Sequence, residues 1–283
     1  MIKIIPYFDN EPNELWQEAT KKRNKTKNNP NGLSKIELAL IERSKHAFDN
    51  SVYGHKAVKD KLEEIFNHKC AFCETHDKRA KRDIEHFRPK SIYYWLSYEW
   101  TNFLLSCQAC NREYKKVSFP IENETNRLNL NVNFDKQDWH IEKLTHENTL
   151  LLHPVLDDPK EHLSFLQDGE ISALTKKGEV SIKGYGLNAD DLIKARKEIV
   201  YDFRKDVWKE YKHTIPNTER ITIVITEVIA ELVERIENKE KEYIGFATTI
   251  LENFEAFIID NQDLGIDMPD KDIMRQVARS ILQ

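Results

Sequence analysis

The sequence predicts an α+β protein that is mainly helical. Apolar residues recur at helical spacing before residue 69 and again after residue 188, whereas the middle of the chain holds short, strand-like runs. Two Cys-x-x-Cys pairs fall in that middle region. We therefore expect three parts: a helical lead-in over residues 1–69, a cysteine-stapled module over residues 70–120, and a region over residues 121–283 that is first mixed and then helical.

Composition places the chain among globular proteins. Of its 283 residues, 40% are hydrophobic and 32% are charged, which supplies a core and excludes disorder of the whole chain. No apolar run approaches the roughly 18 residues that a membrane span needs. The N-terminal residues lack the apolar stretch and cleavage site of a signal peptide. We expect a cytoplasmic protein with no membrane partner.

Charge is unevenly distributed along the chain. The formal net charge is −5 at pH 7, yet residues 69–116 carry ten Lys/Arg against six Asp/Glu. Residues 21–27 form a second basic cluster, and residues 217–260 carry four basic against ten acidic residues. Basic regions on an acidic protein indicate a confined site for a polyanion. For residues 21–27 alone, ordinary solvated surface is the alternative.

The lead-in is predicted to begin with a strand-like segment, Ile2–Tyr7. A basic, Asn-rich loop follows it and contains Asn29-Pro30-Asn31-Gly32. Helices are then predicted over Ser34–Asn50 and His55–Asn67, where Leu and Ile recur at helical spacing.

All four cysteines belong to the two pairs, Cys70 with Cys73 and Cys107 with Cys110, which are separated by 33 residues. In a reducing compartment this pattern is typical of a metal site and not of two disulfides. Two such turns supply four thiolates, the tetrahedral shell of zinc, with Zn–S near ~2.3 Å. A complete shell leaves no open coordination position. The predicted zinc is therefore structural.

The residues between the cysteine pairs are expected to carry structure of their own. Asp83–His86 alternates as a short strand does, and Pro89 forces an extended or turned chain at the residue before it. A helix is predicted over Gln108–Lys116, because no Gly or Pro occurs there. The aromatic residues over 93–100 are interpreted as packing for a long loop, with base stacking as the alternative.

Within this segment the sequence resembles the HNH, or ββα-metal, endonucleases. The matching residues are Glu85 and His86, then Asn102, and Asn111 directly after the second cysteine pair. The nuclease motif is specific, because several residues fall in register with one another.

A narrower resemblance is to the HNH nuclease subunit of Septu antiphage systems and related retron systems. It rests on Ile-Glu-His-Phe-Arg-Pro-Lys (84–90), Tyr-Glu-Trp-Thr-Asn (98–102) and Cys-Gln-Ala-Cys-Asn (107–111). Weaker matches, Leu-His-Pro-Val-Leu-Asp-Asp-Pro (152–159) and Gly-Leu-Asn (186–188), extend it to about residues 70–196. In that family the second subunit is an ABC/SMC-like ATPase.

The resemblance implies a role for each motif residue. Glu85 is expected to bind a catalytic divalent ion, and Asn111 to complete that site through its side-chain oxygen. His86 is the expected general base, since an imidazole with a pKa near ~6.5 accepts a proton at neutral pH. Asn102 is expected to tie the long loop and so orient the base. The oxygen-rich donor set favours Mg²⁺ or Mn²⁺.

Basic residues flank this predicted site. At least two of them are expected to contact the phosphate backbone, although each alone is an ordinary surface charge. The candidates are Arg88, Lys90, Arg112, Lys115 and Lys116. The choice of DNA over RNA rests on the resemblance.

The rest of the chain is predicted to change from strands to helices. Short strands are expected around Leu128–Val132, at Ile171–Leu174 and at Val180–Ile182, with Gly169 and Gly178 at turns. Helices are expected over Asn188–Thr214 and Thr218–Asn238, with Tyr243–Ile259 continuing or pairing with the latter. The chain has no phosphate-binding loop, since Gly184-Tyr185-Gly186 lacks the required spacing and lysine.

Together these observations predict a metal-dependent DNA endonuclease that works with an ABC/SMC-like ATPase subunit in antiphage defence. Two alternatives stay open: a stand-alone HNH restriction-type nuclease, and a zinc-stapled nucleic-acid-binding module without catalysis. The C-terminal helices carry no evident catalytic residue and suit a docking role, which favours the first hypothesis. The binding module requires Glu85, His86 and Asn111 to coincide by chance.

Overall fold

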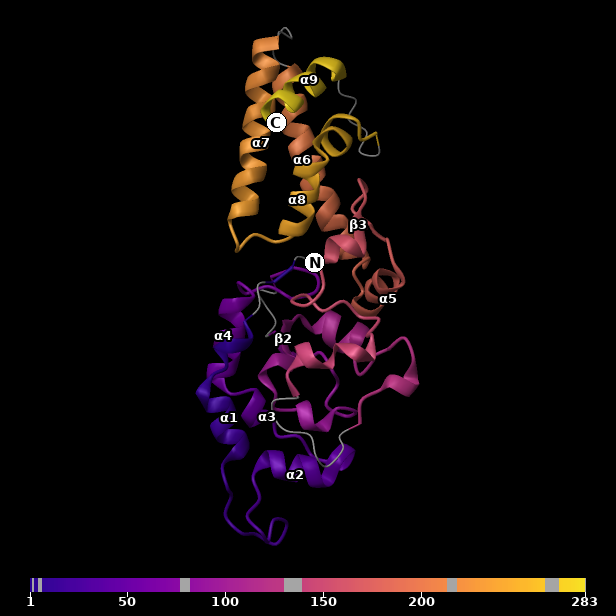
Figure 1. The fold of residues 1–283 in the computed structure, drawn as a ribbon. Coiled ribbons are helices and arrows are strands. Elements are labelled where there is room, and N and C mark those ends of the chain that lie inside the picture. Colours follow the sequence, from indigo (N-terminus) through magenta and orange to yellow (C-terminus); the bar gives the residue numbers. More distant parts are fainter. Residues whose placement is uncertain are drawn as a thin grey trace.

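The computed structural model describes residues 1, 3–4, 7–76, 82–129, 139–212, 218–262 and 270–282. The molecule is elongated (Figure 1), with helices α1–α4 at one end and the bundle of α6–α9 at the other. The strands β1 and β2 lie on the side of α1–α4, and β3 and α5 lie between them and the bundle. This arrangement agrees with a mainly helical α+β protein that holds two small sheets.

Short helices form the lead-in, namely α1 (Asn13–Thr20), α2 (Lys35–Glu42), α3 (Asn50–Tyr53) and α4 (Lys56–Ile65). Ser34 begins α2 with a capping box, in which its hydroxyl accepts from the Glu37 N–H and the Glu37 carboxylate accepts in return. The helix predicted over Ser34–Asn50 is too long, because the backbone turns at Arg43 with φ of +54°. The helix predicted over His55–Asn67 is confirmed by α4.

The segment predicted as a strand at Ile2–Tyr7 lies partly outside the described residues. The residues of it that the structure describes, Lys3, Ile4 and Tyr7, are in no strand. Ile4 instead donates its N–H to the carbonyl of Pro154, 2.7 Å away. This contact holds the start of the chain against the middle of the molecule.

The central element is an antiparallel pair of strands followed by a short helix. Strand β1 (Asp83–His86) pairs with β2 (Phe103–Ser106) in a register that sets Asp83 opposite Ser106 and His86 opposite Phe103. A short π-helix, η5 (Ala109–Lys115), begins three residues after the end of β2. The predicted strand at 83–86 is confirmed. Strand β2 is absent from the sequence prediction, because all four of its residues are buried and show no alternation.

Residues 121–187 connect the central sheet to the bundle. They form the 3₁₀ helix η8 (Ile141–Glu147), the antiparallel strands β3 (Leu163–Phe165) and β4 (Ile171–Ala173), and helix α5 (Lys176–Tyr185). Strand β4 confirms the prediction at 171–174. Of the strand expected around 128–132, Leu128 is in no strand and residues 130–132 lie outside the described residues.

The strand predicted at Val180–Ile182 is wrong, because these residues lie in α5. The Thr175 hydroxyl caps this helix by accepting from the N–H of Gly178, so Gly178 is in the first turn of a helix and not in a loop. The buried residues Gly178, Ser181 and Tyr185 follow helical spacing. The alternation of apolar and polar residues in Val-Ser-Ile is typical of a strand, and it is too short to show the helical period of the whole segment.

The bundle contains α6 (Asp190–Lys212), α7 (Thr218–Glu237), α8 (Ile244–Glu252) and α9 (Lys271–Leu282), with a π-helical turn, η10 (Glu255–Ile259), between the last two. Helix α7 packs against the other three. Its buried residues are all apolar and lie three or four positions from one another along one face of the helix: Ile221, Val224, Ile225, Val228, Ile229 and Leu232. The predictions for α6 and α7 are confirmed, whereas α9 is absent from the sequence prediction. No described helix combines the length and hydropathy that a bilayer span requires.

The loop between α7 and α8 contacts the turn that carries the first cysteine pair. The Lys69 ammonium donates to the carbonyl of Lys241 at 2.8 Å, and the Glu74 carboxylate accepts from the N–H of Gly245 at 3.1 Å. Glu74 itself has a φ of +64°. The bundle is therefore attached to the central element at this turn.

A buried ion pair joins the loop after β1 to η8. Arg88 Nε lies 2.8 Å from Glu147 Oε2, and both side chains are at most 2% exposed. The second carboxylate oxygen of Glu147 accepts from the Tyr93 hydroxyl at 2.7 Å and from the N–H of Leu128 at 2.9 Å. Because both carboxylate oxygens of Glu147 have partners, the pairing offsets the cost of burying two charges.

We predict that Glu147→Ala lowers the free energy of unfolding by about 3–5 kcal/mol, because it leaves the Arg88 guanidinium buried without its counter-charge. Urea unfolding followed by circular dichroism measures the change. The matched control is Glu142→Ala on the same 3₁₀ helix, whose side chain is 55% exposed. The control is expected to stay within about 0.5 kcal/mol of the wild type. Equal effects of the two substitutions would contradict the structural role of this pair.

Candidate functional site

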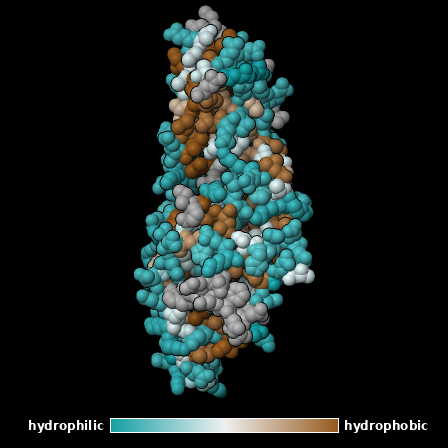
Figure 2. Space-filling model, in the orientation of Figure 1, coloured by the Kyte–Doolittle hydropathy of each residue, from teal (hydrophilic) through white to brown (hydrophobic). Residues whose placement is uncertain are grey.

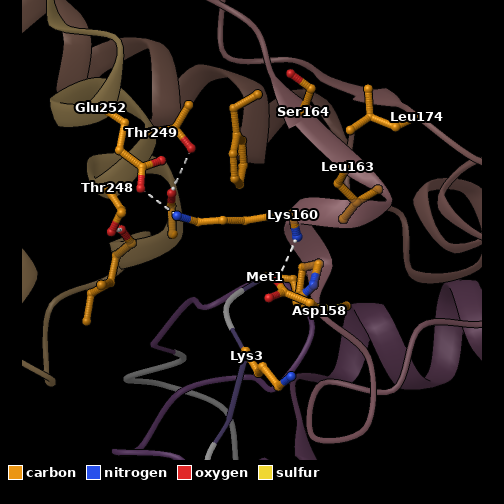
Figure 3. A pocket seen from close by; sticks show the side chains of 14 residues that line it. Met1, Lys3, Asp158, Lys160, Leu163, Ser164, Leu174, Thr248, Thr249 and Glu252 are labelled. Carbon is orange, nitrogen blue, oxygen red and sulfur yellow. Dashed lines mark hydrogen bonds and ion pairs between the residues drawn. The ribbon is translucent and has the colours of Figure 1, made fainter.

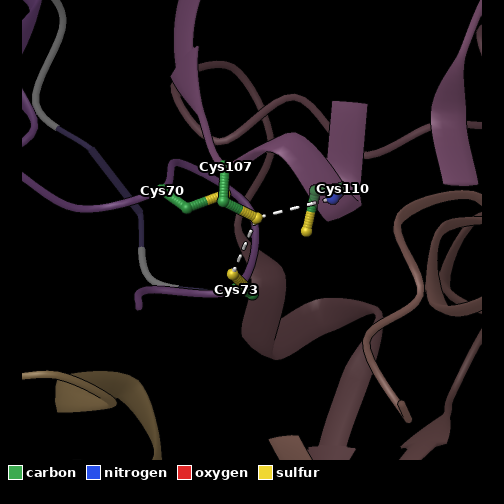
Figure 4. A group of neighbouring side chains, drawn as sticks. All are labelled: Cys70, Cys73, Cys107 and Cys110. Carbon is green, nitrogen blue, oxygen red and sulfur yellow. Dashed lines mark hydrogen bonds between the residues drawn. The ribbon is translucent and has the colours of Figure 1, made fainter. Parts of the chain in front are cut away.

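The two cysteine pairs meet at the end of β2. Cys107 follows β2 directly, Cys110 lies in η5, and Cys70 and Cys73 lie in the turn after α4. All four thiols are free and buried, and their sulfur atoms lie within 4.8 Å of one another (Figure 4). The Cys73 and Cys107 sulfurs are 3.8 Å apart. Four Zn–S bonds of ~2.3 Å in a tetrahedron place sulfurs at about this separation. The cluster can therefore hold a metal ion such as zinc.

Hydrogen bonds fix the cysteine turns to the sheet. The N–H of Ala71, between the first two cysteines, donates to the carbonyl of Leu105 in β2 at 2.8 Å. The Cys110 N–H donates to the Cys107 sulfur at 3.4 Å, and the Thr75 hydroxyl lies 3.0 Å from the Cys73 sulfur. The cluster thus joins the turn after α4, strand β2 and the start of η5 into one unit.

One face of β1 meets one face of η5. Asp83 and Glu85 share a face of the strand, because side chains alternate along it. The Asn111 amide donates to Asp83 Oδ2 at 3.1 Å. One helical turn later, Lys115 Nζ lies 2.5 Å from Glu85 Oε1. The predicted metal ligands Glu85 and Asn111 are therefore on facing surfaces of these two elements.

The carboxylate of Glu85 is buried together with its counter-charge. The Glu85 side chain is 5% exposed and that of Lys115 is fully buried. Burial raises the pKa of Glu85, and the positive charges of Lys115 and Lys90 oppose this rise. The ion pair with Lys115 is the contact that favours the ionised carboxylate in this position.

His86 lies on the opposite face of β1, where its ring is held by a backbone carbonyl. Its Nε2 is 3.0 Å from the carbonyl oxygen of Ser97. Because a carbonyl only accepts, Nε2 carries the proton and Nδ1 has the free lone pair. The ring packs edge-on against Tyr53 and Phe103, each with centroids 4.9 Å apart. Burial lowers the pKa of His86 to about 3, so the imidazole is neutral at pH 7.

Asn102 ties the two ends of the long loop between β1 and β2. Its Oδ1 accepts from the N–H of Arg88 at 2.8 Å, and its Nδ2 donates to the carbonyls of Arg88 at 3.0 Å and Leu96 at 3.3 Å. The Leu96 contact lies next to Ser97, whose carbonyl holds His86. The side chain of Asn102 therefore fixes the part of the loop that orients the imidazole.

The structure divides the predicted phosphate contacts into two groups. Arg88 and Lys115 are buried and paired with Glu147 and Glu85, so neither is available to a phosphate in this conformation. The other three reach the surface. Arg112 is exposed but makes a bidentate contact with Asp83, Lys90 is half-buried over the Tyr53 ring, and Lys116 is exposed.

The donor set around Glu85 suits a hard, weakly coordinated ion. Apart from the cysteine cluster, no three His, Cys, Asp or Glu side chains in the described ranges converge on a common point. A carboxylate and an amide oxygen supply few protein ligands. Mg²⁺ typically binds in this way, through one or two carboxylates while keeping several waters. By donor type, a carboxylate and an amide oxygen are compatible with an Mg²⁺-type ion, and the described residues form no second cage for zinc.

A separate cavity of about 530 Å³ lies between residues 158–165, α8 and the start of the chain. Lys160 crosses it and its ammonium lies 2.6 Å from Glu252 Oε1 (Figure 3). Thr248 and Thr249 line one side, but their hydroxyls donate to carbonyls of their own helix. The cavity shares no lining residue with β1, β2 or η5.

Three curated proteins are similar to this chain. The Septu protein PtuB of Bacillus mycoides (strain KBAB4) is 39% identical over 171 residues, which cover 55% of this chain and 55% of that protein. The Septu protein PtuA of the same strain is 29% identical over 155 residues, 50% of this chain and 20% of that protein. The Septu protein PtuB of Bacillus thuringiensis is 40% identical over 86 residues, 29% of this chain and 34% of that protein.

The chain thus spans about half the length of the first of these relatives and less of the other two. No family model matches the chain. No solved structure matches it either. Similarity to Septu proteins is therefore the relationship that the comparisons support.

Sequence reasoning misses the partners of the motif residues. It assigns Lys115 and Arg88 to phosphate, whereas the structure pairs them with Glu85 and Glu147. The sequence does contain a signal for the Glu85–Lys115 pair. Glu85 lies two residues after an acidic residue on a strand, and Lys115 lies four residues after Asn111 on a helix, so each of the two lies on the same face as another polar residue of its own element. The sequence contains no such signal for the contact between His86 and the Ser97 carbonyl, because every residue has a backbone carbonyl.

We predict that Cys107→Ser abolishes zinc binding and lowers the melting temperature. Structural zinc contributes its binding energy to folding, and a loss of about 5 kcal/mol corresponds to roughly 10–20 °C in a protein of this size. Metal analysis and differential scanning fluorimetry are the measurements. Ser118→Ala, at an exposed position, is the control and is expected to melt as the wild type does. A Cys107→Ser protein with one bound zinc and an unchanged melting curve would refute the four-cysteine site.

Proposed function

We propose that the chain is a metal-dependent HNH endonuclease that hydrolyses DNA phosphodiester bonds in the cytoplasm, as the nuclease subunit of an ATPase-coupled antiphage defence complex. One observation carries the proposal: an antiparallel strand pair followed by a helix sets the face of β1 that carries Asp83 and Glu85 against the face of η5 that carries Asn111 and Lys115. His86 lies next to Glu85 in β1. The similarity to proteins named Septu PtuB and PtuA supports the defence role and the presence of a partner.

Each residue has a part in the proposed reaction. A divalent ion supplies positive charge at the scissile phosphate and the leaving oxygen. Glu85 and Asn111 would hold it through oxygen atoms. His86 would take a proton from the attacking water at Nδ1, because the Ser97 carbonyl fixes the tautomer with that nitrogen unprotonated. Asn102 keeps the loop, and with it the carbonyl, in place.

The proposed catalytic groups are closed to substrate in this conformation. Glu85 is 4% exposed and His86 is 5% exposed. The low pKa of His86 has the same cause, burial, and it makes the imidazole a weak base here. A phosphodiester therefore reaches these groups only after a rearrangement. This requirement favours a nuclease that is activated by a partner over one that acts alone.

We propose the outer stripe of α7 as the surface that docks the ATPase subunit. This stripe consists of the exposed residues Ile223, Glu227, Ala230, Glu231 and Glu234. Figure 2 shows apolar side chains gathered along α7 and α8, bordered by hydrophilic ones. Mixed acidic and apolar character suits a partner surface with basic groups around an apolar centre. In the domain division that we propose, residues 70–120 are the nuclease module and residues 121–283 carry the docking surface.

The first experiment is plasmid cleavage in Mg²⁺ or Mn²⁺, with and without the ATPase subunit of the same system and ATP. We predict that His86→Ala lowers the nicking rate by at least about 10²-fold, the usual contribution of a general base. His68→Ala is the matched control, because His68 has an exposed ring outside the site. It should cut as the wild type does.

Other outcomes separate the alternatives. Cleavage that is complete without the ATPase indicates a stand-alone nuclease. Absence of cleavage under every condition, by folded protein with zinc bound, contradicts the nuclease and leaves the nucleic-acid-binding module. Equal nicking by His86→Ala and the wild type would remove His86 from the reaction.

The docking surface is tested by charge reversal. We predict that Glu227→Lys with Glu231→Lys reduces copurification of the ATPase subunit more than tenfold, because like charges at an interface cost several kcal/mol. The matched control reverses Asp60 and Glu64, an exposed pair with the same spacing on α4. Undiminished copurification by the α7 variant would exclude this stripe as the docking surface.

A further inference from the structure

The side chain of Lys115 is completely buried, which is rare for a lysine unless it is paired. Its ammonium lies 2.5 Å from Glu85 Oε1 and also donates to the carbonyl oxygen of His86 at 3.3 Å. These acceptors belong to neighbouring residues at the end of β1. Lys115 therefore holds both the proposed metal ligand and the backbone of the proposed base.

The strand and the helix are matched in spacing. On β1, Asp83 and Glu85 are two residues apart on one face, and on η5, Asn111 and Lys115 are one turn apart on one face. The Asp83–Asn111 contact and the Glu85–Lys115 contact are successive links between these faces. Lys115 is thus fixed by the same packing that brings Asn111 to the site.

The two oxygen atoms of the Glu85 carboxylate differ in their surroundings. Oε1 is fully buried and faces the ammonium of Lys115. Within the described part of the chain, Oε2 accepts no hydrogen bond, and the ammonium of Lys115 approaches the carboxylate at Oε1. The side chain's 5% exposure therefore comes from atoms other than Oε1. Oε2 is the oxygen that an ion could reach.

Lys115 could in principle compete with a metal ion for Glu85, since both are cations. Competition requires the ammonium to leave when the ion binds. A fully buried lysine with a second acceptor at the His86 carbonyl has no solvated position to move to, and separating the charges inside the protein is costly. The geometry instead keeps the ammonium on Oε1 while Oε2 stays free.

We propose that Lys115 is a positioning residue that fixes Glu85 through Oε1 and so presents Oε2 to the divalent ion. This inference rests on the proposed nuclease function. Groups that hydrogen-bond a metal-ligating carboxylate orient it, and removing such a group typically costs about 10–100-fold in metal affinity. Lys115 therefore orients a metal ligand from a buried position, and it is not one of the contacts to the DNA backbone.

The test is Mn²⁺ binding to the full chain with zinc in place, measured by electron paramagnetic resonance of free Mn²⁺ and by the melting temperature. The variants are Lys115→Met, which removes charge and donor, and Lys115→Gln, which keeps an N–H donor. Lys116→Met is the matched control, because Lys116 is the exposed neighbour and the substitution removes the same charge. Glu85→Gln defines the binding that depends on Glu85.

We expect Lys115→Met to weaken the Glu85-dependent binding of Mn²⁺ by about 10–100-fold, with Lys115→Gln in between and Lys116→Met unchanged. If Lys115→Met does not fold, the comparison of Lys115→Gln with the wild type decides. Unchanged affinity in the Lys115 variants would overturn the positioning role, and raised affinity would identify Lys115 as a competitor. Failure of the underlying function gives a different result, since wild type would then bind no more Mn²⁺ than Glu85→Gln does.

Discussion

The four-cysteine cluster fixes the geometry on which the candidate site depends. A two-stranded sheet of four-residue strands is at best marginally stable in water. The cluster attaches the end of this sheet to the turn after α4 and to the start of η5, through Cys107 and Cys110. Asn111 follows Cys110 directly, so a metal ion held by the four cysteines would set where η5 begins. That position determines which side chains of η5 face β1.

Buried charges then complete the site on this frame. Arg88 pairs with Glu147 in the loop after β1, and Lys115 pairs with Glu85 at its end. In each pair the attraction between opposite charges opposes the desolvation cost of burying them, and removing one partner would leave a buried charge uncompensated. Basic residues that sequence alone assigns to the nucleic acid thus hold the site together. The accessible positive charge that remains comes from residues such as Lys90 and Lys116.

The parts of the fold that could be predicted are those with a local signal. Residues that are close in sequence determine both the 3.6-residue hydrophobic period of α6 and α7 and the capping box of Ser34. The cysteine pairs carry their own spacing, which is why the cluster can be predicted without knowledge of the fold. The failures are where a short pattern competes with a longer one, as at 180–182, or where a strand is buried on both faces, as at 103–106.

For the site, sequence identifies the motif residues but not their partners. Asn102 is tied to the backbone of Arg88, and its expected role in orienting the base stays a prediction. The contacts of Glu85 and His86 with Lys115 and the Ser97 carbonyl depend on how β1, η5 and the long loop pack. Such contacts join residues roughly 10 to 30 positions apart, and no local period encodes them.

The closed site and the bundle are connected through the first cysteine turn. Glu74 and Lys69 of that turn contact the loop between α7 and α8, and Ala71 of the same turn contacts β2. A partner on α7 would therefore act on an element that touches both the metal cluster and the sheet. Under the proposed function, these contacts are a continuous physical route from the docking surface to the strand pair that carries His86. Under the same proposal, the burial of Glu85 and His86 keeps substrate from these residues until a partner binds.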